Sequence, residues 1–224
     1  MSISVKEIKQ VLRDKGVTSL YHADTVAMSL LYLESGGLLP GDAWEVSGVM
    51  PPSRRRDAET RPLGMFHDVF FASCDEHDRV QRYNLYGPVL YVYSLEVLDQ
   101  LAGQEVLITR EHPLRWAGER GEELYFRSVQ EMQEQFCAGD ICQYVAVRNA
   151  HEPIGFDCLQ EIVLDDPNIE NDNFFRAFSK ISKLKKQKGI EAPLTVRQCR
   201  KCQKKFCRRS YGTLSEKEWE YYFG

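Results

Sequence analysis

The sequence lacks any apolar run of about 18 residues, the length that a membrane-spanning helix needs. Residues 1–7 also lack the apolar core of a signal peptide. Internal repeats and low-complexity segments are absent too, which excludes a repeat architecture. We therefore expect a cytoplasmic protein with no membrane partner.

The composition is that of a folded chain rather than a disordered one. The chain has 224 residues, 43% of them hydrophobic, which is enough to bury a core. This length suits one domain plus an appendage. We expect the domain over residues 1–170, and a basic helix with a cysteine-rich C-terminal tail over residues 171–224.

Positive charge is concentrated in one stretch of the chain. The net charge is −4, yet residues 176–209 hold 13 Lys and Arg against a single acid, Glu191. This split predicts an acidic body with a basic arm or small basic module. A solvated, lysine-rich helical tail explains the same pattern and stays open.

Hydrophobic periodicity predicts an α+β fold, in which a mixed sheet is flanked by helices. Apolar residues share one helical face over 4–15, and residues 86–94 are the best strand candidate because they are rich in β-branched and aromatic side chains. Further strands are expected at 17–22, 66–71, 105–109, 144–148 and 159–164, and further helices at 25–34, 95–101, 128–136 and 173–188. Residues 40–62 read as a loop, and residues 191–195 as a proline-containing break.

Two polar residues near the start of the chain could serve one ligand. His22 ends a predicted strand, and Thr25 begins the following helix. An imidazole, a hydroxyl and the N–H groups of a helix N-terminus together suit a phosphate-containing ligand. A half-exposed histidine with a hydrogen-bonded ring is the simpler interpretation of His22 alone.

Glu161 is a lone carboxylate within an otherwise apolar strand, beside Leu159 and Ile162. A partly desolvated carboxylate in such a place can stabilise a cationic transition state. A charge on an edge strand that faces water is the simpler interpretation of Glu161 alone.

Three segments together resemble the DarT-type ADP-ribosyltransferase toxins. Residues 20–25 followed by Gly36-Gly37-Leu38-Leu39 resemble the opening motif of that family, and residues 86–91 are similar to its Tyr-x-Pro strand. Residues 159–163 stand where its catalytic Glu strand would fall. The resemblance spans roughly residues 18–166. Phe156-Asp157-Cys158 replaces the aromatic and Arg run that usually precedes the catalytic Glu.

The resemblance implies an ADP-ribosyltransferase-like fold and NAD as co-substrate. His22 and Thr25 would bind NAD, while Glu161 would orient the ribose and stabilise the charge that develops as nicotinamide leaves. By the same resemblance the chain would be a bacterial toxin of a toxin–antitoxin or anti-phage system. It would then act on RNA or DNA bases, and its partner would be an antitoxin, with or without a chaperone.

The NAD diphosphate would need an arginine to pair with its negative charge. We favour Arg82, which leads into the strand at Tyr86; the other candidates are Arg54, Arg55, Arg56 and Arg79. Tyr83 or Tyr86 could stack on nicotinamide. Residues 148–156, just before the Glu strand, would be the loop that recognises the acceptor.

The seven cysteines are odd in number and irregularly spaced, which favours thiols or metal ligands over disulfides. Cys199, Cys202 and Cys207 make up three of the four ligands of a closed zinc site. The tail contains no His, so the fourth would come from a partner chain or from the body, at Cys137, Cys142 or Cys158. Reduced thiols without metal are the alternative.

Two further patterns leave other functions open. His67-Asp68 and residues 75–78 hold His and carboxylates that could bind a metal for hydrolysis, or lie in a solvated loop. The basic tail interleaves Phe206 and Tyr211 with cations, as nucleic-acid binders do. The rivals to a nucleic-acid-modifying transferase are a non-catalytic binding protein that uses this tail, a protein-modifying ADP-ribosyltransferase and an NAD glycohydrolase.

Overall fold

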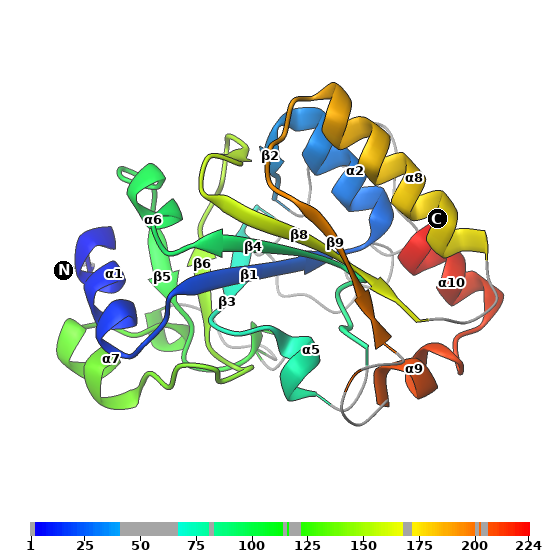
Figure 1. Cartoon of the computed structure of the whole chain (residues 1–224). Helices are drawn as coiled ribbons and strands as arrows, with labels where there is room; N and C mark the ends of the chain where they lie inside the picture. Colours follow the sequence, from blue (N-terminus) through cyan, green and yellow to red (C-terminus); the bar gives the residue numbers. More distant parts are fainter. Residues whose placement is uncertain are drawn as a thin grey trace.

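The chain folds as the α+β protein that the sequence predicts, with a seven-stranded mixed sheet and helices on its flanks (Figure 1). The computed structural model describes residues 3–40, 67–80, 83–113, 116, 122–167, 172–199, 202 and 206–224. Residues 41–62 of the predicted loop at 40–62 lie outside these residues, as do the candidate arginines Arg54, Arg55, Arg56 and Arg82. No helix of the described part is both long and apolar enough to cross a bilayer.

The helices in chain order are α1 (Val5–Asp14), α2 (Val26–Ser35), α5 (Glu76–Arg79), α6 (Val97–Gln100), α7 (Val129–Gln135), α8 (Asp172–Gln187), α9 (Phe206–Tyr211) and α10 (Glu216–Phe223), with a 3-10 turn, η2, at Glu122–Leu124. The strands are β1 (Ser19–Asp24), β2 (Gly37–Leu38), β3 (Val69–Ala72), β4 (Val89–Ser94), β5 (Val106–Ile108), β6 (Tyr144–Val147), β7 (Ile154–Gly155), β8 (Leu159–Asp166) and β9 (Leu194–Gln198).

The main sheet has the strand order β5-β6-β3-β1-β4-β8-β9. All neighbouring pairs in it are antiparallel except β8 and β9, which run parallel. A parallel pair needs a crossover connection, and α8 supplies it between β8 and β9. Strands β2 and β7 form a separate two-stranded sheet.

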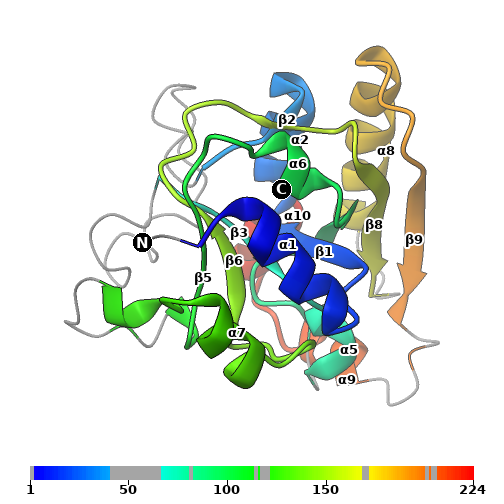
Figure 2. The ribbon, with the colours of Figure 1, turned by 90° about the vertical axis from the view of Figure 1, so that its left-hand side faces the viewer.

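Helix α1 forms where the sequence predicts it, for identifiable local reasons. Ser4 and Glu7 make a capping box, in which each side chain accepts a hydrogen bond from the other residue's backbone N–H. Its buried side chains are Ile8, Val11 and Leu12, which recur at helical spacing. In Figure 2 this helix lies near α6 and α7, which it also contacts.

A second helical layer covers the other end of the sheet. Helices α2, α8 and α10 all contact one another, and Ala177 and Ile181 are the buried side chains of α8 (Figure 1). A capping box at Ser215 starts α10, whose Trp219, Tyr222 and Phe223 are buried. The aromatic end of the described chain therefore docks on the body.

The C-terminal segment is more ordered than a basic tail. Residues 194–198, which overlap the predicted break at 191–195, form the edge strand β9 on β8. Tyr211 and Phe223 are fully buried in the same hydrophobic cluster as Leu20 and Val69. Residues on both sides of position 170 thus share one sheet and one core.

The two positions that follow α2 are both glycine, for different structural reasons. Gly36 takes a left-handed conformation, with φ of 79°, and ends the helix. Gly37 pairs with Gly155, and a Cβ at Gly37 would lie 2.5 Å from the Ile154 carbonyl oxygen. This motif therefore brings the start of the second sheet against residues 154–155.

Gly87 lets the segment before β4 pass directly over the end of β1. A Cβ at Gly87 would lie 2.0 Å from the Asp24 carbonyl and 2.3 Å from the Thr25 nitrogen, both of which are backbone atoms. We therefore expect Gly87→Ala to lower the free energy of unfolding by about 1–3 kcal/mol, the usual cost of overpacking. Denaturant unfolding measures this loss.

The matched control is Gly155→Ala, because a Cβ at Gly155 would meet no atom within 4 Å. Equal stability losses in the two variants would contradict the argument from close backbone approach.

Candidate active site

The three segments that carry the sequence motifs are adjacent strands. β4 lies between β1 and β8, and the register aligns His22 with Tyr91 and Ile162. The next row aligns Tyr21 with Val92 and Glu161. Cross-strand partners point to the same face of a sheet, whereas successive residues alternate. Glu161 therefore lies on the face opposite to His22.

On one face, His22 is held beneath α2. Its Nδ1 lies 2.8 Å from the Phe70 carbonyl oxygen, and its Nε2 lies 3.3 Å from the Tyr32 hydroxyl. The Tyr32 hydroxyl in turn donates to the Asp24 carboxylate at 2.6 Å. A carbonyl oxygen only accepts, so Nδ1 carries the proton of the first bond. The His22 ring is thereby fixed between two strands and a helix.

Thr25 begins α2 and is buried, with 1% of its surface exposed. Its hydroxyl accepts a hydrogen bond from the Met28 backbone N–H at 3.3 Å, and its own N–H donates to Asp24 at 2.8 Å. The Thr25 hydroxyl is thus the N-cap of the helix. His22, Asp24 and Thr25 together order the junction of β1 and α2.

On the opposite face, Glu161 is half-buried and held by a neighbouring strand. The Thr195 hydroxyl, on β9, donates to Glu161 Oε1 at 2.6 Å. Ser19 donates to the adjacent Gln160 at 3.2 Å. A register irregularity in β8 opposite Val92 and Tyr93 accompanies this position. The sequence could not reveal Thr195 as a partner, because β9 itself was not predicted.

The row that contains Glu161 continues across the sheet to a second polar group. Tyr21 pairs with Ala72, and Ala72 pairs with Tyr144. The Tyr144 hydroxyl donates to Glu76, and burial raises the pKa of Tyr144 far above its usual value. Polar side chains therefore occupy both ends of this row, on one face.

The predicted NAD-binding residue Tyr86 belongs to that second group. Its hydroxyl lies 3.1 Å from His112 Nε2, which also lies 3.4 Å from the Tyr144 hydroxyl. His112 was not predicted as a functional residue, since nothing in its local sequence signals a site. Tyr83 is placed elsewhere: its ring stacks on Tyr211 at a centroid distance of 5.0 Å.

The first residues of the predicted acceptor loop, 148–156, make hydrogen bonds and an ion pair with the body of the protein. Arg148 donates to Asp68 at 2.6 Å and to the Tyr125 hydroxyl at 2.8 Å. Burial raises the pKa of Asp68, an effect that the Asn149 N–H and the Arg148 charge oppose. Asp68 is therefore the partner of an ion pair rather than a ready metal ligand.

A group of side chains that could hold a metal ion lies beyond the end of β9. His77, Cys199, Cys202 and Cys207 each offer one ligand atom, and these atoms all lie within 4.8 Å of one another. The three cysteines are those that the sequence predicts. The structure brings His77 to them from α5, in place of Cys137, Cys142 or Cys158.

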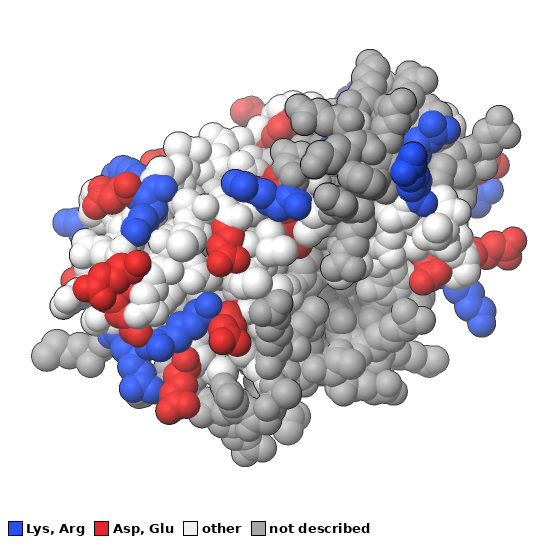
Figure 3. Space-filling view, turned by 90° about the horizontal axis from the view of Figure 1, so that it is seen from below, with Lys and Arg blue, Asp and Glu red and all other residues white. Residues whose placement is uncertain are grey.

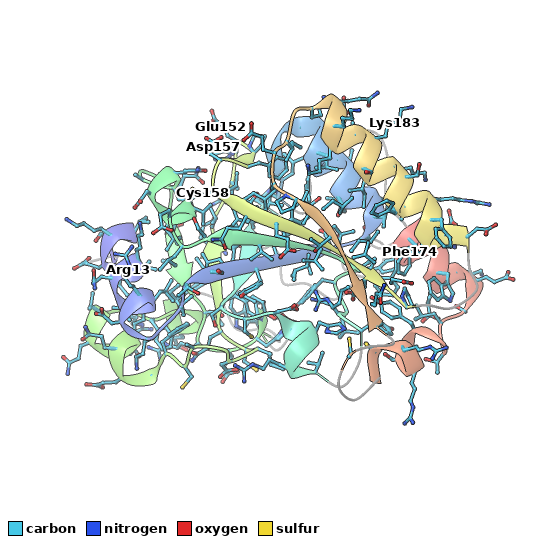
Figure 4. The ribbon with its side chains drawn as sticks, in the orientation of Figure 1. Arg13, Glu152, Asp157, Cys158, Phe174 and Lys183 are labelled. Carbon is cyan, nitrogen blue, oxygen red and sulfur yellow. The ribbon has the colours of Figure 1, made fainter. Side chains whose placement is uncertain are left out.

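The face seen in Figure 3 carries Lys and Arg interspersed with Asp and Glu over the described residues. Mixed charge of this kind gives no single-sign field over the part of that face that the structure describes. The basic residues that favour an anionic partner are on α8 instead. Arg176, Lys180 and Lys183 are exposed at helical spacing, and Lys183 points away from the sheet in Figure 4.

No protein-family model matches the chain, and no curated protein matches it. Solved structures of DarT from Thermus sp. 2.9 are similar to it. The complex with ADP-ribosylated single-stranded DNA has a TM-score of 0.48 and 15% identity, and covers 86% of this chain and 97% of that one. The complexes with carba-NAD+ and NAD+ have TM-scores of 0.47, with 16% and 15% identity, and cover 85% of this chain and 98% of theirs.

The Tyr32 hydroxyl links His22 to Asp24, so its removal tests how the junction of β1 and α2 is held. We expect Tyr32→Phe to lower the free energy of unfolding by about 1–2 kcal/mol, because the partly buried Asp24 carboxylate loses a donor. Chemical denaturation monitored by fluorescence measures the change.

Tyr93→Phe is the control, since the buried Tyr93 hydroxyl has a 3.5 Å contact to a carbonyl and, among the described residues, bonds no charged group. If Tyr93→Phe costs as much as Tyr32→Phe, the carboxylate is not the reason for the loss.

Proposed function

We propose that this chain is an NAD-dependent ADP-ribosyltransferase that modifies nucleic acid, with Glu161 as its catalytic carboxylate. The adjacency of β1, β4 and β8 carries this proposal. Segments that are far apart in the sequence, each resembling a motif of one enzyme family, become neighbouring strands. The register puts Glu161 two strands from Tyr21, about 10 Å between backbones.

The chemistry requires one carboxylate in a fixed place. The bond from nicotinamide to ribose C1′ breaks with its electron pair on nicotinamide, which leaves positive charge on the sugar, as in glycoside cleavage. The Glu161 carboxylate stabilises that charge. A nucleophilic atom of the acceptor then bonds to C1′, and Glu161 accepts the proton that the acceptor loses.

Thr195 positions the catalytic group in this proposal. Its hydroxyl donates to Oε1 of Glu161 at 2.6 Å, and in this proposal the other carboxylate oxygen contacts the substrate. A carboxylate whose orientation is fixed before the reaction needs less reorganisation during it. Residue 195 is therefore a positioning residue, and Glu161 is the residue that would touch the ribose.

The NAD site would extend from Glu161 to the junction of β1 and α2. The N–H groups at the start of α2 suit a diphosphate, and an arginine, for which we keep Arg82, would pair with it. Tyr86 would lie against the nicotinamide, on the Glu161 face of the sheet. His22 and Thr25 would order the junction from the α2 side, because the sheet separates the His22 ring from Glu161.

The acceptor would be a nucleic acid, RNA or DNA, held in part by the exposed cations of α8. By the family resemblance the chain would act as a toxin in a toxin–antitoxin or anti-phage defence system. Modification of nucleic acid without control kills the host, so an antitoxin partner would be required.

Glu161→Gln keeps the shape of the side chain and removes its charge. We expect transfer of labelled ADP-ribose from NAD to fall at least about 100-fold, the usual effect of losing one electrostatic stabiliser, with folding retained. The assay offers single-stranded DNA, duplex DNA, RNA and protein in separate pools. Label on one nucleic acid in wild type, lost in the variant, identifies the acceptor.

The control is Glu134→Gln, an exposed glutamate of α7, outside the residues assigned to the site. Expression of the same variants in a bacterial host adds a second readout, in which wild type and Glu134→Gln arrest growth and Glu161→Gln does not. Label on polypeptide alone would replace the nucleic-acid acceptor with protein, and free ADP-ribose would indicate an NAD glycohydrolase. Full activity of Glu161→Gln would remove Glu161 from the site.

A nucleic-acid-binding protein without catalysis is the rival, and the basic face of α8 is the observation that favours it. Deletion of residues 190–224 cannot test it, because the deletion removes β9 and exposes the edge of β8. The double variant Lys180→Glu/Lys183→Glu changes exposed charge while keeping the fold. We expect weaker binding to single-stranded DNA or RNA and a shallower salt dependence, by about 0.7 per lost phosphate contact.

Lys6→Glu/Lys15→Glu makes the same change in net charge at exposed positions in and just after α1, and we expect it to leave affinity nearly unchanged. Equal losses in the two double variants would mean that net charge, and not the α8 face, governs binding. Binding that depends on α8 with no NAD-derived product from wild type would support the rival.

A further inference from the structure

The cluster of His77, Cys199, Cys202 and Cys207 joins two distant parts of the chain. His77 lies in α5, whereas Cys199 directly follows β9 and Cys207 lies in α9. Figure 4 shows sulfur atoms gathered near α5 and α9. Neither segment has a complete ligand set by itself, so the site exists only in the folded protein.

The spacing of the ligand atoms matches one tetrahedral metal ion. Zinc binds thiolate at about 2.3 Å and imidazole at about 2.0–2.1 Å, which puts the corners of its tetrahedron about 3.5–3.8 Å apart. His77 Nε2 lies 3.7 Å from Cys202 Sγ and 4.0 Å from Cys199 Sγ. All four ligand atoms lie within 4.8 Å of one another, close enough for small side-chain adjustments to bring each to bonding distance from one ion.

The donor set selects the metal. Three thiolates and one imidazole in tetrahedral arrangement are typical of structural Zn²⁺, while oxygen-binding Mg²⁺ and Ca²⁺ disfavour such ligands. His77, Cys199 and Cys207 are buried, and Cys202 is half-buried. Four protein ligands leave no open coordination position for a substrate, which indicates a structural rather than a catalytic ion.

The residues around the cluster hold its ligands in place. Asp75 accepts a hydrogen bond from the His77 backbone N–H at 3.0 Å and pairs with Arg197 at 2.6 Å. Arg197 also pairs with Asp165 at 2.9 Å, and Asp165 receives the Tyr211 hydroxyl at 3.0 Å. Outer partners of this kind orient metal ligands. Here they connect α5, β8, β9 and α9 around one point.

We infer that His77, Cys199, Cys202 and Cys207 bind one Zn²⁺ as a closed structural site that fastens α5 to the C-terminal segment. The three cysteines bind as thiolates and release their protons to solvent. Glu76 directly precedes His77 and accepts the Tyr144 hydroxyl. The same ion thereby fixes one polar group on the face that carries Glu161.

The test begins with the metal content of the full chain. Protein purified without added metal or chelator is expected to carry one zinc per chain by elemental mass spectrometry. His77→Ala and Cys202→Ser are expected to lose it, whereas His77→Cys, which supplies a fourth thiolate, retains it. Cys137→Ser removes an exposed cysteine outside the cluster and is expected to keep the zinc.

A strong chelator should lower the Tm of wild type, and of Cys137→Ser equally, while His77→Ala responds little. None of these readouts requires NAD or a nucleic acid, so they stand apart from the transferase proposal. Zinc retained at full stoichiometry by His77→Ala would overturn the four-ligand site.

A measurement on wild type alone covers the case in which the variants do not fold. Cobalt(II) exchanged into the wild-type protein is expected to give the intense visible absorption of a tetrahedral thiolate site. Weak octahedral absorption would overturn the inference, as would an intact mass lower by two hydrogens together with a peptide map that places a disulfide among the three cysteines. So would a wild-type chain that binds no zinc when zinc is supplied.

Discussion

Strand β8 pairs along both of its edges, antiparallel with β4 and parallel with β9. This double pairing decides which side chains meet. It turns Ile162 and Leu164 into the core and leaves Glu161 half-buried on the other face. At the far end of the strand it places Asp165 against Arg197 and Tyr211. Catalytic candidate, core and C-terminal segment therefore depend on one set of backbone hydrogen bonds.

Elements whose signals are local could be predicted from the sequence. The capping box at Ser4 and the β-branched run in β4 lie within a few residues of what they specify. Strand β9 could not be predicted in this way. Its five residues follow a proline, and only a partner far away in the chain makes them a strand. Helices α9 and α10 were not predicted, because their residues were interpreted as a basic, cysteine-rich tail.

The same distinction between local signals and long-range pairing applies to the candidate site. Residue types point to His22, Glu161 and the three clustered cysteines, but faces and partners follow from register. His22 and Glu161 lie on opposite faces because the pairing puts them in adjacent rows. His77 joins cysteines more than 120 positions away, a proximity that no local spacing encodes. The contacts of Thr195 with Glu161 and of His112 with Tyr86 likewise depend on the fold and have no local sequence signal.

The position of β9 has a consequence for protein synthesis. A nascent chain that ends before Leu194 already contains β8 but cannot supply its parallel neighbour, the hydroxyl of Thr195 or the three clustered cysteines. Such a chain would present an unpaired strand edge to any extended peptide nearby. Completion of the sheet, and with it any activity of Glu161, would therefore wait until residues 194–207 have left the ribosome.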